Sequence, residues 1–167
     1  MQKAIFLDRD GVLNEERGEY TYTPEDFIIP EGTIEALQKL KEAGFLLIVI
    51  TNQGGIAKGL YTAQDVLNCH TYLQQQCGFL IDDLYYSPYH EAYSNSLSRK
   101  PDSLMLEKAI AKYHINPTLS WMVGDSLRDM IPAQKLGIRT IKIGKKIDLH
   151  VDFYAENLWE ASKQILK

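Results

Sequence analysis

The sequence has few cysteines, no long apolar run and no excess of basic residues, and each shortage excludes a class of protein. Its two cysteines, Cys69 and Cys77, lie about 12 Å apart along one predicted helix, too far for a disulfide. No apolar run has the length of a signal peptide or a membrane span. The net charge of −4 disfavours non-specific binding to nucleic acid, which depends on clustered Lys and Arg. We therefore expect a cytoplasmic protein that binds neither membranes nor nucleic acid.

The rest of the composition is ordinary for one globular domain. The chain has 167 residues, of which 45% are hydrophobic and 24% are charged. A chain of this length buries enough surface to fold without disulfides or structural metals. We expect a single domain over residues 1–167 and a monomer.

Apolar runs alternate with helical patterns along the chain. The runs predict strands over residues 3–8, 45–51, 83–87, 120–124 and 138–143. The helical patterns cover residues 33–43, 62–78, 101–114, 126–136 and 157–166. The second run is apolar throughout, which is typical of a parallel strand covered on both faces. The sequence therefore predicts an α/β fold, a doubly wound, Rossmann-like parallel sheet of about five strands, with ligands at the carboxyl ends of the strands.

Acidic residues follow two of the predicted strands. Asp8 and Asp10 end the first strand, and Gly11 lets the chain turn, so that one carboxylate can attack while the other handles protons. Asp125 and Asp129 follow the fourth strand and share a face if a helix has begun there. Four crowded carboxylates need a cation, and oxygen ligands suit Mg²⁺. We expect a magnesium ion among these four residues.

Two polar segments offer groups that bind anions. Residues 51–55, Thr-Asn-Gln-Gly-Gly, provide a hydroxyl and free backbone N–H groups. Arg99 and Lys100 precede a helix whose first position we expect to be Pro101, and a helix N-terminus favours anions. Together with the acidic residues, these segments indicate a site for a phosphate group.

The motifs, in this order, resemble those of the haloacid dehalogenase superfamily of phosphatases. The matching residues are Asp8, Asp10, Thr51, Lys100, Asp125 and Asp129. Residues 6–14, 24–27, 51–57 and 99–101 resemble the branch that contains heptose bisphosphate phosphatases and histidinol-phosphate phosphatases. The resemblance extends from about residue 3 to residue 145.

The resemblance implies hydrolysis of a phosphate monoester through an aspartyl-phosphate intermediate. Asp8 would attack phosphorus, and Asp10 would protonate the leaving oxygen and then activate water. Thr51 and Lys100 would hold the phosphoryl oxygens. Such transfer depends mainly on positioning and on charge neutralisation, which these residue types supply.

The resemblance also implies a metal site and a pocket formed by loops. Asp8, the backbone carbonyl of Asp10 and Asp125 would hold Mg²⁺, while Asp129 would orient Lys100 or a metal-bound water. The loops are too short for a separate cap domain. The implied substrate contacts are Arg9, Glu16, Arg17, Gly18, Tyr20, Asn52, Gln53, Gly54 and Arg99. Of these, Arg17 could also meet a second phosphate, because guanidinium groups bind phosphate bidentately.

Several functions remain open at this level. The first choice is removal of the 7-phosphate of D-glycero-D-manno-heptose 1,7-bisphosphate, a step of carbohydrate metabolism; the alternatives are histidinol phosphate and another small phosphorylated metabolite. A phosphate-binding receiver module would need an acid after its middle strand, where residues 86–88 read Tyr-Ser-Pro. A phosphatase-like protein that binds without hydrolysis is disfavoured because every core position is filled.

The loop of residues 88–98 departs from its relatives. Members of this branch commonly hold a structural zinc there, with Cys-x-His and Cys-x-Cys ligands. The corresponding residues 87–89 and 96–98 read Ser-Pro-Tyr and Ser-Leu-Ser. Because a neutral hydroxyl is a poor zinc ligand, we expect no structural zinc. We expect tyrosine packing and hydrogen bonds from Ser and Asn to the backbone to hold the loop instead, or the loop to be partly mobile.

Overall fold

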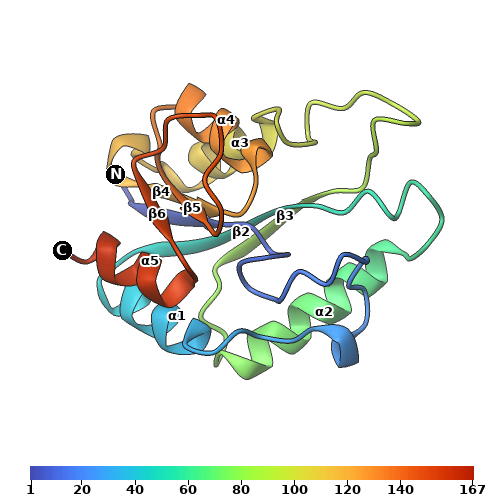
Figure 1. The fold of residues 1–167 in the computed structure, drawn as a ribbon, viewed down its shortest axis with the longest axis horizontal. Coiled ribbons are helices and arrows are strands. Elements are labelled where there is room, and N and C mark those ends of the chain that lie inside the picture. Colours follow the sequence, from blue (N-terminus) through green and yellow to red (C-terminus); the bar gives the residue numbers. More distant parts are fainter.

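A single parallel sheet organises the chain, and the computed structural model describes all 167 residues (Figure 1). The strands are β1 (Ala4–Leu7), β2 (Leu46–Asn52), β3 (Asp83–Ser87), β4 (Trp121–Gly124), β5 (Arg139–Ile143) and β6 (Phe153–Ala155). They pair in parallel in the order β3-β2-β1-β4-β5-β6. The predicted α/β, doubly wound fold is confirmed.

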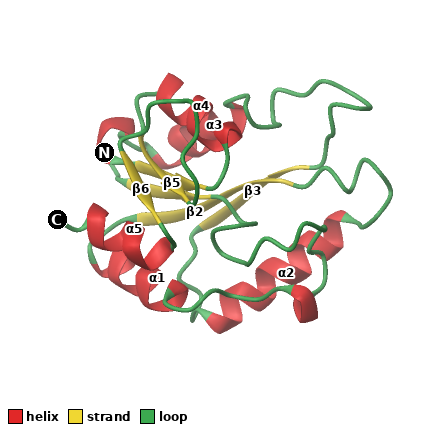
Figure 2. Cartoon of the chain, viewed as in Figure 1, coloured by secondary structure: helices red, strands yellow, loops and turns green.

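Helices cover both faces of this sheet (Figure 2). They are α1 (Thr33–Glu42), α2 (Ala63–Gln76), α3 (Leu104–Tyr113), α4 (Leu127–Lys135) and α5 (Leu158–Ile165), with short 3₁₀ turns at Pro24–Asp26 and Pro117–Leu119. Helices α1, α2 and α5 lie on one face, and α3 and α4 lie on the other (Figure 1). None of these helices is long and apolar enough to cross a lipid bilayer.

The two faces of β2 explain why its sequence is apolar throughout. Leu47 and Val49 belong to a cluster of 21 buried residues that includes side chains of α1, α2 and α5. Ile48 and Ile50 point the other way, into a cluster of 13 buried residues with α3 and α4. Because successive side chains of a strand alternate between faces, both sets must be apolar.

The strand order reverses beside β1. The chain first builds β2 and β3 outward from β1, and then returns to place β4 on the other side of β1. Leu7 pairs with Val123, so the residues that follow β1 and β4 emerge side by side at the carboxyl edge. A reversal of this kind opens a crevice at that edge, where α/β proteins bind their ligands.

Two predicted features differ from the structure. The sheet has a sixth strand, β6, which sequence patterns missed because it has three residues and its Phe153 and Tyr154 are partly exposed. The helix predicted to start at Pro101 starts at Leu104 instead, because residues 99–102 form a turn in which the N–H of Asp102 donates to the carbonyl of Arg99. The positive end of that helix is therefore not where the argument for anion binding had placed it.

Candidate active site

The acidic residues that follow β1 and β4 meet at the point where the strand order reverses. The N–H of Asp8 donates to the carbonyl of Val123 over 3.0 Å, which fixes Asp8 beside the end of β4. Gly11 lies at φ +85°, and a Cβ atom there would fall 2.1 Å from Oδ2 of Asp125. Only glycine therefore lets the loop after β1 pass this close to Asp125.

A buried lysine joins two of these carboxylates. The Nζ atom of Lys100 lies 2.9 Å from Asp8 Oδ1 and 2.5 Å from Asp129 Oδ1, and it donates to the carbonyl of Ile50 over 2.9 Å. Its side chain is 4% exposed. All three ammonium donors are thus used, so the head of Lys100 is held at one point between β1, β2 and α4.

Burial and mutual charge shift the pKa values of this cluster. Burial would lower the pKa of Lys100, but Asp129 and Asp8 raise it, so the lysine stays charged. Burial and the charge of Asp129 raise the pKa of Asp8 well above its usual range, with Lys100 opposing them. Burial and Asp129 also raise the pKa of Asp125 to about 6. The site therefore carries more negative charge than one lysine offsets.

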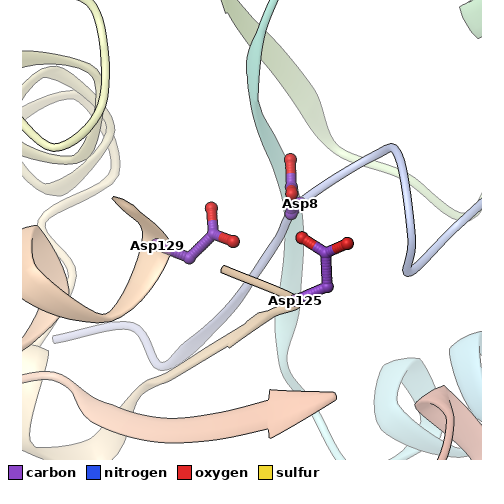
Figure 3. A group of neighbouring side chains, drawn as sticks. All are labelled: Asp8, Asp125 and Asp129. Carbon is purple, nitrogen blue, oxygen red and sulfur yellow. The ribbon is translucent and has the colours of Figure 1, made fainter. Parts of the chain in front are cut away.

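Three carboxylates are close enough to share a metal ion (Figure 3). Ligand atoms of Asp8, Asp125 and Asp129 all lie within 4.8 Å of one another. Asp129 also accepts from Lys100 and from Ser126, and it caps the start of α4. Asp125 forms neither a hydrogen bond nor an ion pair, and its pKa is raised. An all-oxygen donor set with uncompensated charge fits Mg²⁺, with Asp8 and Asp125 as the carboxylates left available.

The carboxylate of Asp10 lies apart from this group. Its Oδ1 accepts from Arg9 Nη2 over 2.9 Å and from Asn14 Nδ2 over 3.0 Å, and its Oδ2 accepts from Gln53 Nε2 over 3.2 Å. The side chain is 28% exposed and lines a cleft. Three donors from two loops therefore hold Asp10 in one orientation while it remains open to solvent.

A buried chain of hydrogen bonds connects Asp10 to the end of β2. Gln53 Nε2 also donates to Oγ1 of Thr51 over 2.9 Å, and its Oε1 accepts from the hydroxyl of Tyr61 over 2.7 Å. Tyr61 packs so closely on Gly55 that a Cβ atom there would lie 2.1 Å from the ring. Sequence reasoning missed Tyr61, because an isolated tyrosine in a loop carries no signal.

The end of β2 also fixes the backbone of Lys100. The side chain of Asn52 donates to the carbonyl of Lys100 over 3.0 Å and accepts from its N–H over 2.9 Å. This paired contact replaces a helix start as the local support for Lys100. Asn52 thus positions the lysine besides lining the cleft.

The cleft has a volume of about 530 Å³, with Asp10 among its lining residues. Predicted substrate contacts that line it are Glu16, Gly18, Tyr20, Asn52, Gly54 and Arg99. Lining residues that sequence reasoning missed are Glu19, His90, Glu91 and Arg128. Most of the predicted contacts are therefore brought together around one opening.

Three predicted substrate contacts lie outside the cleft. Arg9 is 3% exposed and donates to Asp10 and to the carbonyl of Thr21, so it holds the loop after β1 from within. Gln53 is equally buried, in the hydrogen-bond chain described above. Arg17 forms an ion pair with Asp26 over 3.1 Å. These placements give the three side chains structural roles in the loops.

Three hydroxyl groups meet at the base of the loop 88–98. Oγ of Ser98 lies 2.9 Å from Oγ of Ser87 and 2.9 Å from Oγ of Ser96. The expected hydrogen bonds of serine are present, but they run chiefly between side chains. The expected tyrosine packing is present in part: the ring of Tyr93 packs edge-on against that of His90, with 6.3 Å between the centroids, but Tyr89 is 46% exposed and Tyr93 is 66% exposed.

We expect purified wild-type protein to contain less than about a tenth of an equivalent of zinc per chain, because hydroxyls do not replace thiolates as zinc ligands. Elemental analysis after purification without chelator measures this directly. A matched variant with Cys at positions 87, 96 and 98 and His at position 89 restores the ligand set and should bind one equivalent. Stoichiometric zinc in the wild-type loop would contradict the expectation.

Comparison with known proteins identifies the family of this chain. A family model described as haloacid dehalogenase-like hydrolase matches residues 2–137. A D-glycero-beta-D-manno-heptose-1,7-bisphosphate 7-phosphatase of Pasteurella multocida is 39% identical over 158 residues, which cover 88% of this chain and 85% of the relative. The corresponding protein of Haemophilus ducreyi is 37% identical, over 87% of this chain and 86% of the relative.

A solved structure has the same fold. The D,D-heptose bisphosphate phosphatase of B. bronchiseptica, solved in complex with magnesium and phosphate, superposes with a TM-score of 0.89 and 24% identity, over 99% of this chain and 98% of that one. The family model and the sequence relatives confirm the predicted resemblance, and the solved structure confirms the fold. The chain therefore belongs to the haloacid dehalogenase-like hydrolase family, and within that family it is similar to the heptose bisphosphate phosphatases.

Proposed function

We propose that this chain is a magnesium-dependent phosphatase that removes the 7-phosphate of D-glycero-D-manno-heptose 1,7-bisphosphate. The observation that carries the proposal is the buried Lys100, held between Asp8 and Asp129 beside a cleft that Asp10 also lines. A strongly perturbed carboxylate beside a fixed cation is typical of a catalytic centre. The relatives named above supply the identity of the sugar.

Asp8 is the proposed nucleophile. Lys100 Nζ and the N–H of Arg9 both donate to Oδ1 of Asp8, over 2.9 Å and 2.8 Å. The other oxygen, Oδ2, accepts no hydrogen bond and is free to attack phosphorus. Attack forms the bond between Oδ2 and phosphorus and breaks the bond to the sugar oxygen, and water then cleaves the aspartyl phosphate. Lys100 stabilises the charge that develops on the phosphoryl oxygens.

Asp10 is the proposed general acid and base. It would give a proton to the departing sugar oxygen and take one from the attacking water in the second step. The donors Arg9, Asn14 and Gln53 hold its carboxylate in place through both steps. Thr51, which accepts from Gln53, would contribute its hydroxyl to the phosphoryl group.

The proposed metal ligands are Asp8, the backbone carbonyl of Asp10, and Asp125, with Asp129 orienting Lys100. Bound Mg²⁺ would neutralise charge on the phosphoryl oxygens and on the crowded carboxylates. The chain's own contribution is the close approach of Gly11 to Asp125, which brings the loop after β1 to the end of β4.

We also propose that the chain forms one capless domain, that it is a monomer and that it is cytoplasmic. Light scattering measures the oligomeric state.

A panel of phosphorylated metabolites tests the function. We expect kcat/KM for the heptose bisphosphate to exceed that for histidinol phosphate by about a hundredfold, because differential contacts in the cleft decide such ratios. A generic aryl phosphate should be hydrolysed slowly but with many turnovers. A preference for histidinol phosphate would contradict the choice of sugar. Phosphorylation that stops at one equivalent per chain would support the receiver-like alternative instead.

A further inference from the structure

One glutamate lies between two arginines in the candidate cleft. Glu91 Oε2 is 2.6 Å from Nε of Arg99, and Glu91 Oε1 is 3.2 Å from Nη2 of Arg128. Glu91, Arg99 and Arg128 all line the cleft that Asp10 also lines. The three come from separate segments: Glu91 belongs to the loop 88–98, Arg99 begins the turn before α3, and Arg128 is in the first turn of α4.

The two arginines differ in how firmly they are held. Arg99 is 11% exposed, and its Nη1 donates to the carbonyl of Tyr89 over 3.0 Å. Gly54 leaves room for it, because a Cβ atom there would lie 3.0 Å from Nη1. Arg128 is 51% exposed, and Glu91 is its one ion-pair partner. A fixed guanidinium and an adjustable one thus face the same carboxylate.

We propose that Arg99 and Arg128 form a subsite for the second, non-reacting phosphate of the substrate, and that Glu91 occupies this subsite until the substrate displaces it. The inference rests on the proposed function, because it concerns a substrate with two phosphates. It replaces Arg17, the arginine that sequence reasoning had suggested, with Arg128.

The chemistry of the three groups favours an exchange of anions. A hydrogen bond from its own backbone, together with the charges of Arg99 and Arg128, lowers the pKa of Glu91 to about 2, so the side chain is ionised at neutral pH. A phosphate dianion offers more charge and more acceptor oxygens than one carboxylate, and guanidinium groups bind it bidentately. The substrate therefore gains more from the two arginines than Glu91 does.

Glu91 is also easy to displace. Its side chain is 50% exposed, and exposed ion pairs contribute little to the stability of a fold. Serine hydroxyls tie the base of its loop together at residues 87, 96 and 98. The ion pairs of Glu91 with the two arginines can therefore break while the hydrogen bonds among these serines remain. Displacement requires movement only of the Glu91 side chain and its immediate backbone.

Kinetics of four proteins on two substrates test the proposal. Arg128→Gln should lower kcat/KM for the heptose bisphosphate by about 10- to 100-fold, mainly through KM, because a charged hydrogen bond is lost. The ratio of kcat/KM between the bisphosphate and an aryl monophosphate should fall by a similar factor. Glu91→Gln should lower KM for the bisphosphate by about two- to fivefold, because a competing anion is removed.

The matched control is Lys163→Gln. Lys163 forms an ion pair with Glu160 over 2.8 Å on α5, and its exposure of 49% is close to that of Arg128. This variant should leave both constants unchanged, and circular dichroism should show all four proteins folded.

Each contrary outcome has a separate meaning. An equal loss on both substrates in Arg128→Gln would overturn the subsite, although hydrolysis by the wild type would still support the proposed function. A KM raised by Glu91→Gln would overturn the displacement, because Glu91 would then hold the arginines for the substrate. Failure of the wild type to hydrolyse either substrate would contradict the proposed function.

Calorimetry with the bisphosphate and the Asp8→Asn protein separates the subsite from turnover. Adding Arg128→Gln to that protein should raise Kd by about 10- to 100-fold. An unchanged Kd in the double variant overturns the subsite, and so does the absence of any binding to the Asp8→Asn protein itself.

Discussion

Asp8→Asn should reduce turnover of any phosphate monoester by on the order of 10⁴-fold or more, because an amide oxygen cannot form the phosphoenzyme. Lys100 and the N–H of Arg9 donate hydrogen bonds to Oδ1 of Asp8 and hold the carboxylate in place, whereas Oδ2 accepts no hydrogen bond. Steady-state release of inorganic phosphate, measured at saturating magnesium, gives the comparison. A variant that kept a tenth of the wild-type rate would show that another group attacks phosphorus.

A stability measurement distinguishes this loss from unfolding. Burial and the charge of Asp129 raise the pKa of Asp8, so ionisation of Asp8 costs stability in the metal-free chain. Asparagine removes that charge and can still accept from Lys100. We therefore expect Asp8→Asn, measured in chelator, to melt at the same temperature as the wild type or higher. Asp102→Asn, an exposed aspartate in the turn before α3, is the control for substitution alone.

Removal of magnesium should lower turnover by roughly a thousandfold or more, and added Mg²⁺ should restore it. The reason lies in the acidic cluster, where Asp8, Asp125 and Asp129 are within 4.8 Å of one another and Lys100 is the one cation that forms ion pairs with them. Without a second cation, a phosphate that approaches Asp8 meets net negative charge. Rates measured after exhaustive chelation, and again after titration with Mg²⁺, test this. Full activity in the chelated protein would exclude the metal.

A pair of glycine variants locates the metal. An alanine at position 11 would place Cβ 2.1 Å from Oδ2 of Asp125 and force that carboxylate away, so Gly11→Ala should need far more Mg²⁺ for half activity. Gly59→Ala is the control, because Gly59 also has a positive φ of +71° but no atom within 4 Å of an added Cβ. Both variants carry backbone strain, and only the first disturbs Asp125. Equal magnesium requirements would place the ion elsewhere.

The sequence predicted the parts of this site that depend on strand ends. Asp8, Thr51 and Asp125 follow apolar runs, and parallel strands bring their carboxyl ends to one edge, so the proximity of these residues follows from the sequence alone. Lys100 lies near the strand ends, as predicted, but the predicted support for it was partly wrong. It is held by the side chain of Asn52 and by two carboxylates, whereas the expected helix begins later, at Leu104.

The rest of the site depends on loops, which have no periodicity to read. Glu91 and Arg128 are 37 positions apart and look like ordinary surface charges in the sequence. Arg17 appeared equally plausible as a phosphate ligand, yet it pairs with Asp26 outside the cleft. The conformation of the loops over the strand ends decides which surface arginine faces the cleft. Neither the spacing nor the composition of these loops predicts that conformation.

The position of β1 between β2 and β4 has a consequence for the time at which the chain becomes active. Asp8 and Lys100 are 92 positions apart, and the contact that ties β1 to the start of β4 spans 116 positions. Pairings of such high contact order form late and slowly, and during synthesis β1 leaves the ribosome long before β4. Until residues 121–124 join the sheet, Asp8 remains at an open strand edge without its partners. A nascent or truncated chain that lacks residues 121–124 therefore cannot bring Asp125 and Asp129 to Asp8, so the candidate site forms only when the sheet is complete.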